Sequence, residues 1–299
     1  MQNKILKKLF NTTVTMFIIL TILTINKTSN TNTLRTNLEI ENITNISTDN
    51  IYLLNDDNLL VKTNIFLDKN KKIENIIKYL TISNNKTPSG LKAYLPKNIK
   101  LINYFIGNNT LTVNLSKEFM NTNNLDLQVT GLVYSLLELN DIDNIKIQVE
   151  GKQLDNYNKL LNRNLGINNK YLFNNRYDIS KVTVYYIDKI GNKEYYVPVT
   201  KYVNDTRNKV EIIVDELKLS DNNLISYLND NVKLLNYREE ANVLFLNFNN
   251  YLLDQNKKIY NEILNIIAYS IFDNYDVNVV CFEINSKRVV SVKSFVVES

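Results

Sequence analysis

Histidine is absent from this chain of 299 residues, and cysteine occurs once, as Cys281. No disulfide can form within the chain, and zinc sites built from Cys and His ligands are excluded. General acid–base chemistry would therefore fall to carboxylates, lysines or tyrosines. Cys281 lies in an apolar stretch that predicts a strand, so we expect a packed thiol rather than a reactive one.

Glycine and proline are also scarce, with six and three residues, and tryptophan is missing. No glycine-rich phosphate-binding loop is present. The hydrophobic content of 44% is enough for two ordinary cores and excludes a disordered chain. Thirty-five basic and thirty-one acidic residues nearly cancel and form no long basic run, so no nucleic acid partner is expected.

The first thirty residues have the pattern of an export signal that stays as a membrane anchor. Lys4, Lys7 and Lys8 precede an apolar run over residues 14–25, and no small-residue cleavage site follows. The positive end should remain in the cytoplasm, which places the rest of the chain outside the membrane. Residues 31–49 are polar without a sustained period and are expected to be a tether.

One stretch of the sequence occurs twice and organises the remainder. Residues 94–115 align without a gap with residues 227–248, at an offset of 133 (227 − 94), and seven of the first eleven positions are identical. Alternating apolar residues in each copy predict a β-hairpin with one face on a core. Gly107, Asn108 and Asn109 supply the turn in the first copy, because Gly and Asn tolerate positive φ.

The repeat extends on both sides of this hairpin. Residues 72–83 align with 209–220, and residues 133–152 align with 268–287. We therefore expect a first domain at 50–153, a linker at 154–181 and a second domain at 182–299. Hydrophobic spacing predicts four helices, at residues 70–81, 125–139, 208–217 and 257–272. Each domain is predicted to be a two-layer α+β module of order ββαββαβ, with both helices on one face of a mostly antiparallel sheet.

Residues able to carry catalysis are not grouped in any recognisable way. The adjacent acids Asp56-Asp57 and Glu239-Glu240 fall in predicted turns, where neighbouring side chains diverge into solvent. Asp141 and Asp143 vaguely resemble a calcium loop, but its glycine and its later glutamate are absent. Ser116 has no histidine partner and is expected to cap a short turn instead. We therefore predict no catalytic, cofactor-binding or metal-binding residues and no cofactor.

Several short motifs give the module a resemblance to the GerM domain of sporulation and germination proteins. These motifs follow one another in the order Pro88-Ser89-Gly90-Leu91, Leu95-Pro96, Lys100-Leu101, Val113-Asn114-Leu115-Ser116, Val133-Tyr134-Ser135-Leu136 and Val149-Glu150-Gly151-Lys152. The second module has lost part of the pattern, because Asn229 replaces Pro96 and Asn249 replaces Ser116.

The resemblance implies a non-catalytic, membrane-anchored scaffold of the sporulation envelope, with its domains between mother cell and forespore. Its partners would be the membrane, through the N-terminal helix, and the channel or ring proteins whose assembly or localisation it supports. Spore germination would depend on it later. Many relatives are lipoproteins, whereas this chain has no cysteine near its N-terminus, so a protein anchor would replace the lipid.

Nineteen tyrosines raise the alternative of a peptidoglycan-binding module, because aromatic faces stack on sugars. Tyr134 and Tyr269 occupy matched helix positions in the two modules, which is better explained by packing. By contrast, four tyrosines cluster on the first hairpin of the second module and are harder to bury together. We take Tyr185, Tyr186, Tyr195 and Tyr196 as the candidate interaction patch.

Overall fold

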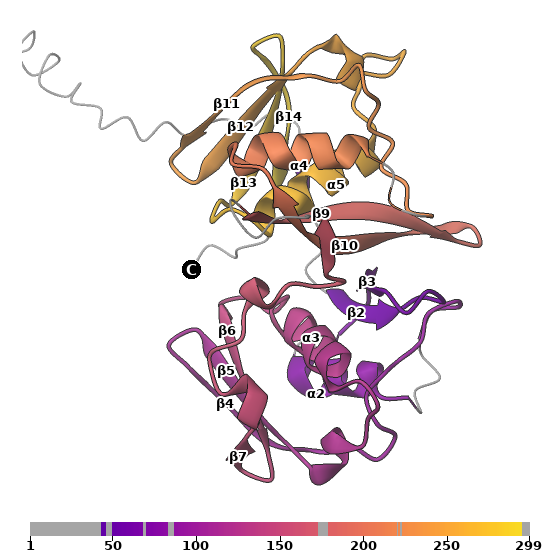
Figure 1. Cartoon of the computed structure of the whole chain (residues 1–299), viewed down its shortest axis with the longest axis vertical. Coiled ribbons are helices and arrows are strands. Elements are labelled where there is room, and N and C mark those ends of the chain that lie inside the picture. Colours follow the sequence, from indigo (N-terminus) through magenta and orange to yellow (C-terminus); the bar gives the residue numbers. More distant parts are fainter. Residues whose placement is uncertain are drawn as a thin grey trace, which may run out of the picture. The chain divides into compact units, whose positions relative to one another are not determined.

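The computed structural model describes residues 43–45, 50–67, 70–82, 87–172, 179–219, 221 and 223–294 (Figure 1). The expected membrane anchor, residues 1–30, lies outside these residues. Among the residues that are described, no helix combines the length and the apolar character needed to span a bilayer. Three residues of the expected tether form strand β1 (Ile43–Asn45), which pairs in parallel with the last strand of the second module.

The described residues of the first module form two helices and six strands. In chain order these are β2 (Asn50–Leu54), β3 (Leu60–Asn64), α2 (Lys72–Leu80), β4 (Leu101–Gly107), β5 (Thr110–Leu115), α3 (Leu125–Leu136), β6 (Asn144–Val149) and β7 (Lys152–Gln153), with a short 3-10 helix at Lys117–Met120. The predicted order ββαββαβ is confirmed here, and the two-residue strand β7 extends it.

The second module repeats this order. Its elements are β9 (Ile179–Ile190), β10 (Lys193–Asn204), α4 (Lys209–Lys218), β11 (Leu234–Glu240), β12 (Val243–Phe248), α5 (Asn261–Phe272), β13 (Val279–Ile284) and β14 (Lys287–Lys293), with a 3-10 helix at Asn250–Leu252. Between the modules, the part of the chain that the structure describes forms two 3-10 helices, Asp155–Tyr157 and Arg163–Leu165, and the short strand β8 (Lys170–Leu172).

The helices lie close to the predicted positions, and their apolar stripes are buried. In α2 the predicted stripe of Ile73, Ile76, Ile77 and Leu80 is buried as a set. The main difference is at α5, which begins four residues later than the expected residue 257. Lys257 has a positive φ of 59°, and the Asp254 carboxylate accepts hydrogen bonds from the N–H groups of Asn256 and Lys258. This local turn competes with the first helical turn.

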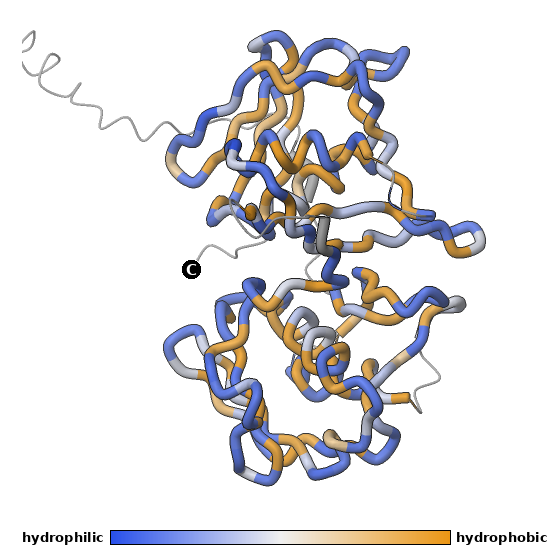
Figure 2. Tube along the Cα trace, in the orientation of Figure 1, coloured by the Kyte–Doolittle hydropathy of each residue, from blue (hydrophilic) through white to orange (hydrophobic). Residues whose placement is uncertain are grey.

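The expected single sheet per module is wrong, because the first hairpin of each module belongs to a different sheet from its later strands. One sheet has the order β4-β5-β6-β7 and another β1-β14-β13-β12-β11. The hairpins β2–β3 and β9–β10 form a third sheet, and in each module the helices lie between a hairpin and the later strands (Figure 1). Figure 2 shows hydrophobic residues along the helices and central strands.

Most neighbouring strands are antiparallel, and two of the parallel pairs are created by the helices. Strands β5 and β6 are parallel because α3 connects them, and β12 and β13 are parallel because α5 does the same. The apolar residues that matched in the repeated stretch face the core in both copies. Buried are Leu111, Val113 and Leu115 in the first module and Leu244, Leu246 and Phe248 in the second.

Ser116 does not cap the 3-10 helix that follows it. Its hydroxyl instead accepts a hydrogen bond from the backbone N–H of Lys100 at 3.0 Å. At the matched place in the second module, the Asn249 side chain accepts from the N–H of Lys233 at 3.1 Å. The replacement of Ser116 by Asn249 therefore preserves the same tie between the chain before the hairpin and the chain after it.

Both repeated hairpins turn through two residues with positive φ. Asn108 and Asn109 have φ of 49° and 55°, and Ala241 and Asn242 have φ of 47° and 63°. This left-handed pair matches the twist of the flanking strands, which is why two-residue hairpin turns favour Asn and Gly. Alanine lacks the local side-chain hydrogen bonds of asparagine and has a Cβ that clashes in this region. Ala241 therefore holds the less favourable of the two turns.

We expect Ala241→Gly to stabilise the protein. Removing the Cβ at φ of 47° should raise the free energy of unfolding by about 1 kcal/mol, since the strained backbone is relieved without loss of contacts. Denaturant unfolding measures this change. The reverse change in the first module, Asn108→Ala, should lower the stability by a similar amount, and equal stabilities of both variants and the wild type would contradict the strain argument.

Candidate functional site: the polar joint between the modules

The two modules share one sheet through strands that are equivalent in the repeat. Strand β3 of the first module pairs antiparallel with β10 of the second, with Lys62 opposite Tyr196. Each is the second strand of its module's first hairpin. Antiparallel pairing of equivalent strands relates the two hairpins by a local two-fold axis. Matched residues of the two modules can therefore meet each other across this axis.

Tyr52 and Tyr185 meet in this way. They lie 133 positions apart (185 − 52), both are fully buried, and their hydroxyl oxygens are 3.0 Å apart. Each is fixed identically by its own module. The N–H of Tyr52 donates to the hydroxyl of Ser135 on α3, and the N–H of Tyr185 donates to Ser270 on α5, both at 2.9 Å. The equivalent serines Ser135 and Ser270 thus hold the two tyrosines so that their hydroxyl groups meet.

A second matched pair crosses the same axis. The Asn55 side-chain amide donates to the carboxylate of Asp188 at 2.8 Å, and these residues are again 133 positions apart (188 − 55). Asn55 follows Tyr52 by three positions, and Asp188 follows Tyr185 by three, so both contacts join equivalent places on the first hairpins of the two modules.

Two carboxylates extend the tyrosine pair, one from the chain after each long helix. Glu138 follows α3 and accepts from the Tyr52 hydroxyl at 3.1 Å. Asp273 follows α5 and accepts from the Tyr185 hydroxyl at 2.9 Å. Both carboxylate side chains are less than 10% exposed. Two acids so close in a buried place require cations, because unpaired buried charge is strongly unfavourable.

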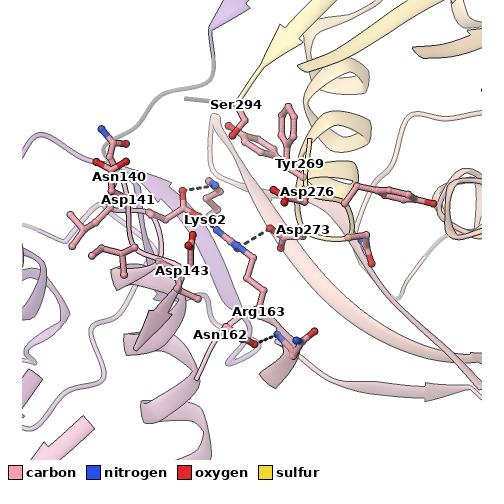
Figure 3. A pocket seen from close by; sticks show the side chains of 18 residues that line it. Lys62, Asn140, Asp141, Asp143, Asn162, Arg163, Tyr269, Asp273, Asp276 and Ser294 are labelled. Carbon is pink, nitrogen blue, oxygen red and sulfur yellow. Dashed lines mark hydrogen bonds and ion pairs between the residues drawn. The ribbon is translucent and has the colours of Figure 1, made fainter. Parts of the chain in front are cut away.

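Arg163 and Lys62 supply these cations. The guanidinium of Arg163 lies between the two acids, with Nη2 2.9 Å from Glu138 Oε1 and Nη1 2.8 Å from Asp273 Oδ1 (Figure 3). The ammonium of Lys62 is 2.7 Å from Glu138 Oε2 and lies 4.5 Å from the ring centroid of Tyr269. Two positive charges thus balance two negative ones. The polar joint is the set Tyr52, Lys62, Glu138, Arg163, Tyr185 and Asp273.

The environment shifts the titration of these groups in opposite directions. Burial alone would raise the pKa of Glu138, but Lys62 and Arg163 lower that pKa to about 2. Burial raises the pKa of Asp273, and Arg163 offsets only part of the increase. Burial also raises the pKa of both Tyr52 and Tyr185, so their hydroxyls stay protonated and able to donate.

The segment expected to be a linker is part of this joint. Asn168 accepts a hydrogen bond from the Leu60 N–H at 2.9 Å and donates to the carbonyl oxygens of Leu60 and Pro198, one in each module. Ile167 is fully buried, and its N–H donates to the Thr200 hydroxyl. The segment's only helical turns among the described residues are the two short 3-10 helices. The described part of this segment, residues 154–172, therefore bonds to both modules and does not merely separate them. We call it the bracket.

A cleft of about 430 Å³ borders the joint. It is lined by the segments that follow α3 and α5, and it brings together Asp141, Asp143 and Asp276 along with the joint carboxylates (Figure 3). Within the described ranges no group of three or more acidic or cysteine side chains has the geometry to hold a metal ion. Glu138 and Asp273 are each bonded to a cation and a tyrosine. The arrangement binds the modules together.

The expected exposed patch of four tyrosines is not formed. Tyr185 and Tyr186 are completely buried, Tyr195 is 7% exposed and Tyr196 is partly buried. The reason is that β9 and β10 are covered by the module's own helices and by the first module. Tyr186 donates to the Glu216 carbonyl and accepts from the buried ammonium of Lys201. Tyr196 accepts from the Asn265 amide.

Sequence reasoning overlooked the residues that matter most here. Tyr52 lies outside the stretches that the sequence aligns, and only the structure shows that it occupies the place of Tyr185. Arg163 and Asn168 had no repeat signal either, since the bracket occurs once and has no second copy to align with. Cys281, predicted to be a packed thiol, is confirmed as a buried free cysteine on β13.

Replacing Arg163 with methionine should be strongly destabilising. The change leaves Asp273 buried without a cation, which costs about 3–5 kcal/mol of unfolding free energy. Arg207→Met is the matched control, because Arg207 pairs with Asp205 and Asp215 on the surface and should contribute at most about 1 kcal/mol. Denaturant unfolding compares the two, and similar small losses would contradict a stabilising role for the joint.

The joint also predicts a pH dependence. The pKa of Glu138 falls from an ordinary 4.5 to about 2 on folding, so its contribution is present above pH 4.5 and is lost as the pH falls toward 2. The lost contribution to the free energy of unfolding is about 3 kcal/mol. Glu138→Gln should abolish that part of the acid-induced loss of stability. Glu74→Gln, on the exposed side of α2, should leave it unchanged, and a wild-type pH profile in Glu138→Gln would refute the assignment.

Comparison with known proteins places this architecture among spore germination proteins. The curated spore germination protein GerM of Bacillus subtilis (strain 168) is 27% identical over 219 residues, which cover 67% of this chain. The matched region spans 60% of that relative's length. A solved structure of the tandem GerMN domains of the sporulation protein GerM from Bacillus subtilis has the same fold. Its TM-score is 0.72 at 24% identity, covering 80% of this chain and 90% of that one.

The family described as "Germane: Sporulation and spore germination" matches the chain twice, over residues 50–155 and 183–290. The two matches fall on the two modules and leave out most of the bracket between them. Together they span well over half of the sequence. The chain is therefore a member of the Germane family, with two GerM-type domains in tandem.

Proposed function

We propose that this protein is a non-catalytic, membrane-anchored scaffold of the sporulation envelope. It would support assembly or localisation of a channel complex between mother cell and forespore, and later spore germination. Membership of the Germane family supports the process. The polar joint supports the scaffold role, because it fixes two similar modules as one unit and leaves their outer surfaces for partners.

The contacts of the ionisable groups support a non-catalytic character. Arg163 and Lys62 are occupied by Glu138 and Asp273, and both acids accept from tyrosines. A general acid or base needs free access to a substrate proton, which these contacts deny. The remaining cleft acids have no histidine to work with, since the sequence contains none.

The proposed location rests on the sequence pattern of residues 1–30 and on the family. The lysine-preceded apolar run would hold the chain in the mother-cell membrane, with both modules in the space facing the forespore. Proteins of the channel or of its rings are the partners that this location makes accessible.

The tyrosines that suggested the alternative of peptidoglycan binding are mostly inaccessible to a ligand. Three of the four tyrosines of the expected patch are buried, so they offer no face on which a sugar ring could stack. The alternative therefore requires other surface residues, and a sedimentation assay with purified cell wall decides it.

The test is recovery of partners by the tagged full-length protein. After brief cross-linking in sporulating cells of its own host, the protein should co-purify with envelope channel or ring proteins. Vegetative cells that express the same tagged chain are the control and should yield none. Sedimentation with purified peptidoglycan, together with no protein partner in sporulating cells, would overturn the scaffold proposal.

A further inference from the structure

Strand β4 forms an exposed, uncharged edge of the first module. It stands at the end of the sheet order β4-β5-β6-β7, and its only strand partner among the described residues is β5. Its seven residues, LINYFIG, include no charge and no proline. Four large side chains on it are open to solvent: Ile102 47%, Tyr104 42%, Phe105 70% and Ile106 49% exposed.

The free side of β4 also presents backbone hydrogen-bonding groups. Gly107 and Thr110 close the two-residue turn, so Gly107 and Phe105 direct their N–H and C=O groups toward β5. Because these directions alternate along an antiparallel strand, Tyr104 and Ile106 direct theirs away from the sheet. An uncharged edge of this kind is a template for another strand, and proteins ordinarily block such edges.

The second module shows what a blocked edge looks like in the same fold. The equivalent strand β11 has the sequence LLNYREE, with Arg238, Glu239 and Glu240 at the places of Phe105, Ile106 and Gly107. Arg238 is bonded to Glu240 and Glu283 and lies 4.0 Å from the ring centroid of Phe245. Charges on an edge strand are the usual protection against pairing. The repeat therefore protects one edge and leaves the other open.

We propose that β4 pairs antiparallel with β4 of a second copy of this chain, across a two-fold axis. Centred on Tyr104, this register places Tyr104 opposite Tyr104 and Asn103 opposite Phe105. A bulge between Leu101 and Asn103 interrupts the regular pairing beyond this point, where Ile102 falls at the level of Ile106 of the second copy. No residue of β4 is charged, so no like charges face each other. Directly opposed aromatic pairs, such as the two Tyr104 rings, stabilise antiparallel strands.

The other edge pairings are less favourable. Pairing β4 with β11 of another copy, centred on the matched tyrosines Tyr104 and Tyr237, puts Ile102 opposite Glu239. Pairing β11 with itself puts Leu235 opposite Glu239. Each arrangement takes water from a carboxylate without giving it a cation. Pairing of equivalent strands also has a precedent within the chain, where β3 and β10 already meet antiparallel.

The dimer should be weak and depend on concentration. One strand pair buries less than the roughly 1,200 Å² that is typical of stable protein interfaces. Copies held close together would pair more readily than the same copies free in solution. This inference concerns self-association and does not depend on the proposed role in sporulation.

Cysteine cross-linking of the full-length protein tests the register. Opposed residues in a hydrogen-bonded antiparallel pair have Cα atoms about 5.5 Å apart, within the range that a disulfide bridges. Tyr104→Cys should therefore form a covalent dimer under mild oxidation. Tyr237→Cys, at the matched place on β11, is the control and should remain monomeric. The wild type is the blank, because its single cysteine is buried. Equal cross-linking of the two variants would overturn the proposal.

A second variant tests the edge without a cysteine. Phe105→Arg with Ile106→Glu installs the residues that β11 already carries, so the module should still fold. Sedimentation equilibrium of the full-length protein in detergent should show at least about a tenfold weaker dimer, because the change removes apolar pairs and adds charge. Tyr251→Glu changes a side chain that is 64% exposed and belongs to the second module, so it should leave the dimer unchanged. A wild type that stays monomeric, or binds only a different protein through β4, would contradict the proposal.

Discussion

The contact of Arg163 with Glu138 and Asp273 is the constraint on which the arrangement of the two modules depends. Both acids follow the long helices of their modules, and both are held by tyrosines that touch across the local two-fold axis. A cluster of four charges in which three side chains are buried and that of Arg163 is partly buried is tolerated only when every charge has a partner. Removing any one partner leaves an uncompensated charge in the joint, so the two modules are bound into a single structural unit.

The internal repeat explains why this joint could form at all. A module whose first hairpin presents a tyrosine, held by a serine on its second helix, is complementary to a second module that presents the same residues. Tyr52 with Tyr185, and Asn55 with Asp188, are contacts between equivalent positions. The single-copy elements, Arg163 and Asn168, then add what symmetry does not provide: one cation between two acids, and one amide that bonds the backbone of both modules.

Local structure was largely predictable from the sequence, and the joint was not. The helix stripe of Ile73, Ile76, Ile77 and Leu80 and the alternation at Leu111, Val113 and Leu115 are periodic signals that depend on nearby residues only. The division of each module into two sheets has no such signal, because it depends on which strands pair over long distances. The clustering of Tyr185 and Tyr186 with two further tyrosines on one hairpin likewise suggested an exposed patch. That clustering does not reveal that the first module packs on this hairpin. It also does not reveal that the buried ammonium of Lys201 bonds to Tyr186.

The central claim, that the two modules fold as one unit, is tested most directly by hydrogen exchange of the full-length protein in increasing denaturant. Amides of β6 in the first module and β13 in the second report on the two cores separately. If the joint couples the modules, both sets should become exposed at the same denaturant concentration and with the same opening free energy. Exposure of β6 and β13 in two well-separated transitions would contradict the account.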